Sequence, residues 1–164
     1  MRKIELYSWV LCLSLAVSLV LAHEGQHPEK ALKGKQKLKM DKAIKEIGVD
    51  YQKNIEPIFK VSCFDCHSSS TSYPWYHGIP GARSMLEKDV STGREHIEMS
   101  GGFPFKGHHT PEQALTGIAY DIDKGKMPPL KYRMMHWKSG LTEKQKQEVE
   151  GWVERSLHKL KKIK

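Results

Sequence analysis

Two cysteines and a histidine stand within five consecutive residues of this chain, in the run Cys63-Phe64-Asp65-Cys66-His67. Thiols separated by two residues can add across two vinyl groups of one porphyrin, and the residue that follows then presents its imidazole to the iron. A short segment with this spacing fixes a large planar group at three points. The motif therefore predicts one covalently attached haem c, with thioethers to Cys63 and Cys66 and with His67 as the proximal iron ligand.

The cysteine pair also fits two other chemistries. A redox dithiol of the thioredoxin type belongs at a helix start in a βαβ unit, but no stretch of this sequence alternates convincingly at the period of two that is typical of strands. A zinc site requires two further ligands, which His96, His108 or His109 would have to supply without a regular ligand spacing. Haem attachment is favoured because it uses the whole five-residue motif.

The first 22 residues have the features of a secretory signal peptide. Arg2 and Lys3 precede an apolar run from Leu6 to Ala22, which ends in small residues typical of a cleavage site. Cys12 leaves with this segment, so the mature chain keeps two cysteines and cannot be a many-bridged disulfide protein. No later run approaches about 18 consecutive apolar residues. The sequence predicts a periplasmic or secreted protein with no membrane span after cleavage.

The mature chain is strongly basic. Residues 1–22 contain Arg2, Lys3 and Glu5, so that 25 of the 27 basic and 18 of the 19 acidic residues remain, and the net charge is +7. A positive surface favours anionic partners. Because an exported protein rarely meets nucleic acid, we expect an acidic redox protein as the partner, with an anionic surface as the alternative. We also expect no nucleic acid and a monomeric chain.

Residues 23–49 form a lysine-rich arm with few large apolar residues. This composition favours a solvated and partly disordered segment; an electrostatic docking arm is the alternative. Met40, Ile44 and Ile47 lie at offsets of zero, four and seven, so a late turn or two of helix can dock on the domain. The folded domain is expected at residues 50–164.

Residues 50–164 predict an all-α domain of four to five short helices with long loops. Loops of this length are uncommon in a small domain unless something holds them, so we expect a bound group to complete the core. Capping boxes at Thr110 with Gln113 and at Thr142 with Gln145 mark two helix starts. The first predicted helix runs from an N-cap at Asp50, with an irregularity at Pro57, to Cys63, and the second runs from Pro80 to Gly93. The third runs from Thr110 to a C-terminal cap at Gly125, and the last runs from Thr142 to Leu160.

The sixth position of the haem iron requires its own ligand. Met127 is followed by two prolines in a loop after a capped helix, so its thioether is held extended and able to reach across a porphyrin face. A neutral thioether favours ferrous iron and raises the reduction potential. His136 is the main alternative, and further candidates are Met134, Met135, Met85, Met99, His96, His108 and His109.

The sequence resembles the small haem-binding domains of the cytochrome c superfamily over nearly all of residues 50–164. The residues that carry the resemblance are Tyr51-x-x-Asn54-Ile55-x-Pro57-Ile58, Ser62-Cys63-x-x-Cys66-His67-Ser68, Thr71-x-Tyr73-Pro74-Trp75-Tyr76, Ile79-Pro80, Asp89-Val90, Gly93-Arg94, Gly125-Lys126-Met127-Pro128-Pro129-x-x-Tyr132, His136, Leu141-Thr142 and Trp152. The resemblance implies a cytochrome c-like helical fold around one haem. It also implies His67 as the proximal ligand and Met127 as the distal one.

Three further features surround this pattern. Trp75 and Tyr76 are expected to wall the haem, because their rings carry polar groups that can meet the propionates. Arg94 is a candidate propionate contact by its charge and planar geometry. The glycine-rich segment Ser100–His109 departs from the family pattern, and we interpret it as a surface loop with solvated histidines; a second metal or a partner contact is the alternative.

Two functions follow from the motif. The favoured one is a periplasmic electron carrier, not an enzyme, in which the haem passes one electron at a time and no substrate binds. The other is a haem protein with an open or displaceable sixth position, acting as a peroxidase or as a gas or redox sensor. A distal histidine with an arginine would be its mark, and Arg94, His108 and His109 are available for that role.

Overall fold

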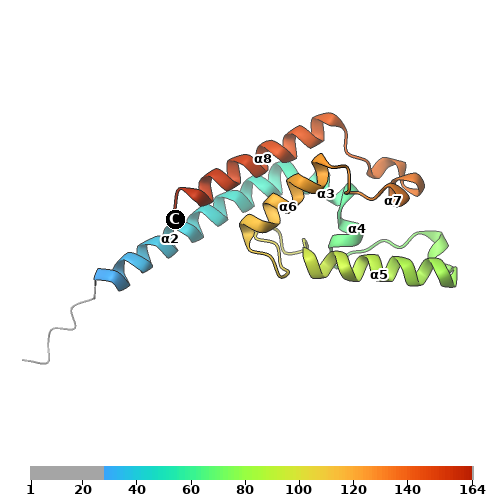
Figure 1. The fold of residues 1–164 in the computed structure, drawn as a ribbon, viewed down its shortest axis with the longest axis horizontal. Helices are drawn as coiled ribbons and strands as arrows, with labels where there is room; N and C mark the ends of the chain where they lie inside the picture. The colour runs from blue at the N-terminus through green and yellow to red at the C-terminus, as the bar shows by residue number, and fades with distance from the viewer. Residues whose placement is uncertain (1–27, 164) are drawn as a thin grey trace, which may run out of the picture. The chain divides into compact units, whose positions relative to one another are not determined.

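The computed structural model describes residues 28–163 of the chain (Figure 1). The signal peptide predicted at residues 1–22 lies outside the described residues. Within them the chain is all-α, as predicted, and its sole β-type pairing is one bridge between Glu98 and Lys106. The α-helices are α2 (Pro28–Asp50), α3 (Glu56–Ser62), α4 (Phe64–His67), α5 (Pro80–His96), α6 (Pro111–Asp123), α7 (Leu130–Met135) and α8 (Glu143–Lys161).

None of the helices in the described part of the chain is long and apolar enough to cross a lipid bilayer. Short 3₁₀ turns at Trp75–Gly78 and Trp137–Ser139 precede α5 and α8.

Helices α2 and α3 are joined without a break by a π-helical turn, Tyr51–Ile55. Pro57 lacks an N–H, and its ring clashes with the carbonyl four residues earlier. The helix therefore widens just before it, and the Glu56 N–H bonds to the Tyr51 carbonyl five residues back. The predicted N-cap at Asp50 is wrong, because Asp50 has helical dihedral angles and makes no capping hydrogen bond.

The residues before Asp50 form a helix from Pro28 onward, although their lysine-rich composition favoured a partly disordered arm. The late turns of α2 pack on the core as expected: Ile47 is fully buried, and Met40 and Ile44 pack against the same cluster. The Lys159 ammonium of α8 donates to the Glu46 carboxylate at 3.0 Å. Residues before position 50 thus contribute to the packed core.

Both predicted capping boxes are present. The Thr110 hydroxyl accepts from the Gln113 N–H, and the Gln113 side chain accepts in return from the Thr110 N–H. Thr142 and Gln145 repeat this arrangement at the start of α8. Gly125 follows α6 with a φ of +62°, the left-handed conformation expected of a C-terminal cap.

Helix α5 continues one turn past the end predicted for it. Gly93 was expected to stop this helix, but its φ is not positive and the helix ends at His96. The glycine serves a different purpose. A Cβ at position 93 would lie 2.9 Å from the Cys66 carbonyl oxygen, so only glycine lets α5 approach the backbone of α4 this closely.

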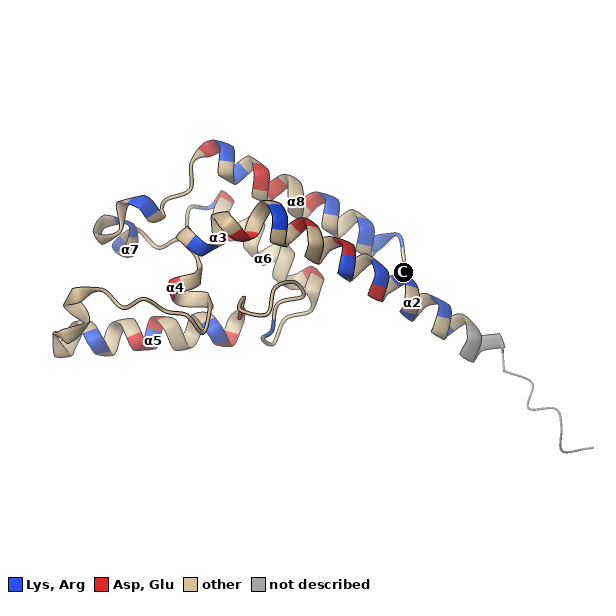
Figure 2. Cartoon of the chain, turned by 180° about the vertical axis from the view of Figure 1, so that it is seen from behind, with Lys and Arg blue, Asp and Glu red and all other residues tan. Residues whose placement is uncertain are grey.

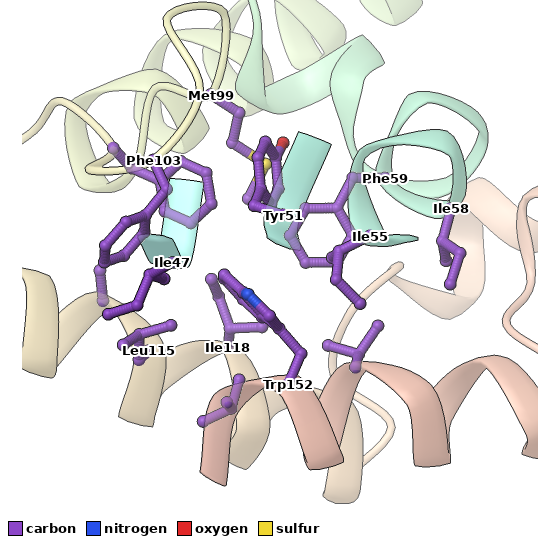
Figure 3. Close-up of a cluster of buried hydrophobic side chains, with 14 of the residues drawn as sticks. Ile47, Tyr51, Ile55, Ile58, Phe59, Met99, Phe103, Leu115, Ile118 and Trp152 are labelled. Carbon is purple, nitrogen blue, oxygen red and sulfur yellow. The ribbon is translucent and has the colours of Figure 1, made fainter. Parts of the chain in front are cut away.

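The core is a cluster of aromatic and aliphatic side chains between α2, α3, α6 and α8 (Figure 3). Tyr51, Phe59 and Trp152 are completely buried, and their rings pack edge-on or tilted at centroid distances of 5.6–6.4 Å. Phe103 and Phe105 join this cluster from the segment Ser100–His109. The prediction of a plain surface loop there is wrong, because these two phenylalanines are 8% exposed.

Candidate functional site

The five-residue motif occupies one helical turn. Cys63 lies between α3 and α4 as the C-cap of one and the N-cap of the other, and its carbonyl accepts from the N–H groups of Cys66 and His67. Residues three and four apart share a helix face. Both thiols and the imidazole therefore face the same side, where all three line one cavity.

The His67 ring is oriented by the backbone of α5. Its Nδ1 lies 3.0 Å from the carbonyl oxygens of Gly93 and Ile97. Since carbonyls only accept, Nδ1 must carry the proton, which leaves Nε2 as the free lone pair. Burial lowers the pKa of His67, although both carbonyl contacts oppose this shift. The imidazole is thus oriented with a free Nε2 lone pair, and it makes the backbone contact that metal-ligating histidines commonly make.

The surroundings of both cysteines favour the protonated thiol. Burial raises the pKa of the Cys63 thiol to about 12, and the neighbouring Cys66 adds to the shift. Burial also raises the pKa of the Cys66 thiol, helped by Asp89 and Asp65. A redox dithiol needs a stabilised thiolate. The environment of this pair is the opposite, which argues against the thioredoxin-type alternative.

The cavity has a volume of about 1140 Å³ and is bounded by α4, α5, α6 and α7. This is slightly above the range of about 300–1,000 Å³ that small-molecule sites occupy. Met127, Met85 and Met135 line it together with Tyr76. The structure thus brings Met127, the predicted distal ligand, into the same cavity as the Cys63–His67 motif.

Three of the predicted site residues lie elsewhere. His136 does not line the cavity; its ring stacks on Tyr132 at 4.1 Å. Trp75 is 83% exposed and also lies outside the lining. Arg94 donates from Nε to the Ser68 carbonyl at 2.7 Å and from its terminal nitrogen to the Thr71 hydroxyl at 2.6 Å. It therefore fastens the loop after the motif to α5, and it is not among the residues that line the cavity.

Two side-chain pairs that the sequence analysis missed hold α7 over the cavity. The Tyr132 hydroxyl donates to the carboxylate of Asp65, which lies between the two cysteines of the five-residue motif. The Lys131 ammonium lies 2.6 Å from the Asp89 carboxylate of α5. Tyr132 was visible only as part of the family pattern, and nothing local in the sequence pairs it with Asp65, 67 residues away.

Residues 23–155 match the family model described as "Haem-binding domain". The chain belongs to this haem-binding domain family. The family and the cavity together establish haem binding, and the donor set of the domain fits the group: two thiols, an oriented imidazole and four thioethers line one cavity. When bound, haem supplies an iron that changes between the ferric and ferrous states.

The haem-binding domain is also similar to a curated protein, "Cytochrome c peroxidase Ccp" of Escherichia coli (strain K12). The two are 25% identical over 93 residues, which are 56% of this chain and 20% of that protein. The chain thus spans about a fifth of the length of this relative. No solved structure gives a significant match.

Proposed function

We propose that this chain is an exported electron carrier, a c-type cytochrome with a single haem bound through thioethers to Cys63 and Cys66. His67 is the proximal ligand of the iron and Met127 the distal one. The observation that carries the proposal is that these four side chains, from α4 and from the loop after α6, line one cavity. A histidine and a methionine are the iron ligands of electron-carrying cytochromes c.

The loop that bears Met127 is fixed by backbone hydrogen bonds. The Asp121 carbonyl of α6 accepts from the N–H groups of Lys126 and Met127 at 2.8 and 3.2 Å. Gly125 allows the reversal between them with its positive φ. The thioether of Met127 is therefore presented from a rigid turn, which suits a ligand that must stay in place in both iron states.

Covalent attachment is tested by extraction of the mature protein, expressed with export and with a haem-attachment system. In acidified acetone the colour should stay with the polypeptide, and neither cysteine should react with a thiol reagent. Extraction of the haem, or two titratable thiols, would contradict the attachment.

The distal ligand is tested by Met127→Ala, with Met134→Ala as the matched control, because Met134 is 75% exposed and lies outside the cavity lining. Loss of Met127 should abolish the weak long-wavelength band of methionine-ligated ferric haem, lower the reduction potential and allow carbon monoxide to bind. Met134→Ala and His136→Ala should leave all three unchanged. Loss of the sixth ligand in His136→Ala would overturn the assignment.

The second candidate function is a peroxidase or a gas or redox sensor with a displaceable sixth ligand. The similarity to a cytochrome c peroxidase supports it. Ready binding of carbon monoxide or turnover of peroxide by the unaltered protein would favour this function over the carrier.

An acidic redox protein remains the proposed partner. Lys37, Lys39 and Lys42 are exposed along α2, and basic side chains are frequent on that helix in Figure 2. Electron transfer to an acidic acceptor should slow as ionic strength rises, since charges are screened over about 8 Å at physiological salt. Changing these three lysines to glutamine should flatten that dependence and leave the haem spectrum unchanged. An unaltered dependence would place the docking charges elsewhere.

A further inference from the structure

Three histidines from two separate segments converge at the junction of α5 and α6. His96 is the last residue of α5, and His108 and His109 stand just before the Thr110 N-cap of α6. One ring nitrogen from each lies within 4.8 Å of the other two. The ring centroids are 4.1–5.9 Å apart. Three titratable rings with converging lone pairs form a set of metal donors.

Backbone contacts bring the segment of His96 and the segment of His108 and His109 together. Glu98 and Lys106 exchange both backbone hydrogen bonds, at 2.8 and 3.0 Å, and so close the intervening loop. Gly107 has a φ of +131°, and a Cβ there would lie 2.4 Å from the His96 carbonyl oxygen. Only glycine allows this approach. The positions of His96 and His108 are therefore set by the ends of two well-formed elements and by a glycine contact.

The hydrogen bonds of the cluster assign its donor atoms. Nδ1 of His108 lies 2.9 Å from the Glu95 carbonyl, so it carries the proton and leaves Nε2 as the lone pair. This Nε2 lies 3.3 Å from Nδ1 of His96. Zinc–nitrogen bonds of about 2.0–2.1 Å in tetrahedral geometry place two ligand nitrogens about 3.3–3.4 Å apart. The pair is thus already spaced for a shared ion, with the carbonyl contact typical of ligating histidines.

We propose that His96, His108 and His109 bind one divalent transition-metal ion of the zinc class. Imidazole nitrogen is a preferred donor for Zn²⁺, Cu²⁺ and Ni²⁺, and the tetrahedral spacing favours Zn²⁺ among them. Binding replaces the proton shared by His96 and His108: the proton of His96 moves to its Nε2, and both lone pairs bind the ion. Three protein ligands leave the fourth position to water or an external ligand. The ion would tie the end of α5 to the start of α6.

The test is a titration of the mature, haem-loaded protein with zinc sulfate by calorimetry, in competition with a chelator of known affinity. One Zn²⁺ should bind per chain, and X-ray absorption at the zinc edge should count three imidazoles. His96→Ala, His108→Ala and His109→Gln should each weaken binding by at least about tenfold, because outer-shell changes alone typically cost 10–100-fold. The thermal midpoint without zinc checks that each variant folds.

Two matched controls separate this site from other histidines. His158→Ala removes an exposed histidine on α8, and a His23→Ala, His27→Ala double variant removes two that lie outside the described residues. Both should bind Zn²⁺ like the parent protein. Unchanged binding in the three cluster variants, or loss of binding in the double variant, would overturn the proposal. None of these outcomes depends on electron transfer.

Discussion

On one side of α4 the chain packs against itself, and on the other it packs around a cavity. The packed side buries Tyr51, Phe59 and Trp152 completely. On the cavity side α5 buries only Val90 and α7 buries no side chain, while Met135 and Met85 stay about half exposed. Burial of apolar surface is the main source of folding free energy. The packed side therefore has its own stability, whereas the cavity side depends on what fills it.

Haem is therefore expected to have two roles in this protein. Haem adds a large apolar surface against which α5 and α7 can pack, and it adds the iron. The contacts that hold α7 without it are Tyr132 with Asp65 and the exposed ion pair Lys131 with Asp89. Exposed ion pairs contribute about 0–1 kcal/mol. We expect the two sides to separate in stability when the haem is removed.

The largest effect should come from removing the attachment. Cys63→Ser with Cys66→Ser should abolish covalent haem, and after acid-acetone extraction the amides of α5 and α7 should lose their protection from hydrogen exchange. The amides of α8 should keep theirs, because α8 contributes Val149, Trp152 and Leu160 to the packed core and no residue to the lining of the cavity. Exchange that stays slow in α5 would mean that the cavity side folds unaided.

A large effect on the packed side should come from Trp152→Ala. Truncation of a fully buried tryptophan costs about 3–5 kcal/mol of the free energy of unfolding. Trp137→Ala is the matched control: this ring is 90% exposed, and its loss should change stability by no more than about 0.5 kcal/mol. Denaturant unfolding of both variants measures the difference. Equal losses of stability in Trp152→Ala and Trp137→Ala would contradict this prediction.

A smaller effect is expected from Tyr132→Phe, which deletes the hydrogen bond between α7 and the motif. Such a bond to a carboxylate contributes about 1.5–3 kcal/mol when buried, and we expect about 1–2 kcal/mol at this half-buried site. The loss should be local, seen as faster exchange in α7. Tyr73→Phe serves as control, because Tyr73 is 42% exposed and lies outside the lining of the cavity. Loss of protection throughout the domain would contradict a local role.

The smallest effect should have the opposite sign. The buried Tyr51 hydroxyl has no hydrogen-bond partner among the described residues, and burial raises its pKa. An unpaired buried hydroxyl is unfavourable, so Tyr51→Phe should raise the free energy of unfolding by up to about 1 kcal/mol. Urea unfolding of the haem-loaded protein measures this change. A loss of stability would show that the hydroxyl has a partner in the haem-loaded state.

Features with local signals were predictable from the sequence. The capping boxes at Thr110 and Thr142 and the left-handed Gly125 each depend on residues within one turn, and the structure has all three. The N-cap assigned to Asp50 was wrong because a π-helical turn absorbs Pro57 without ending the helix. The helix end assigned to Gly93 was wrong because that glycine serves a close contact between helices and not a turn.

The Cys63–His67 motif was recognisable from the sequence as part of the site, and the residues around it were not. The motif specified Cys63, Cys66 and His67 by spacing alone. Whether Arg94 and Trp75 line the cavity depends on which face of their helix or loop is turned toward it. The spacing of apolar residues in the sequence does not predict that face. Phe103 lies in an irregular segment without a repeating pattern, so its burial in the aromatic core became visible only in three dimensions.

The protonated state of the Cys63 thiol has a consequence for the order of assembly. A thiol with a pKa near 12 is almost entirely neutral at physiological pH and is a poor nucleophile. In the closed chain it would react slowly with a vinyl group, whereas in an open chain the thiol has its ordinary pKa. Coupling should therefore come first and compaction afterwards. Haem offered to the refolded chain should bind to His67 long before it becomes covalent, and mild denaturant should speed the second step.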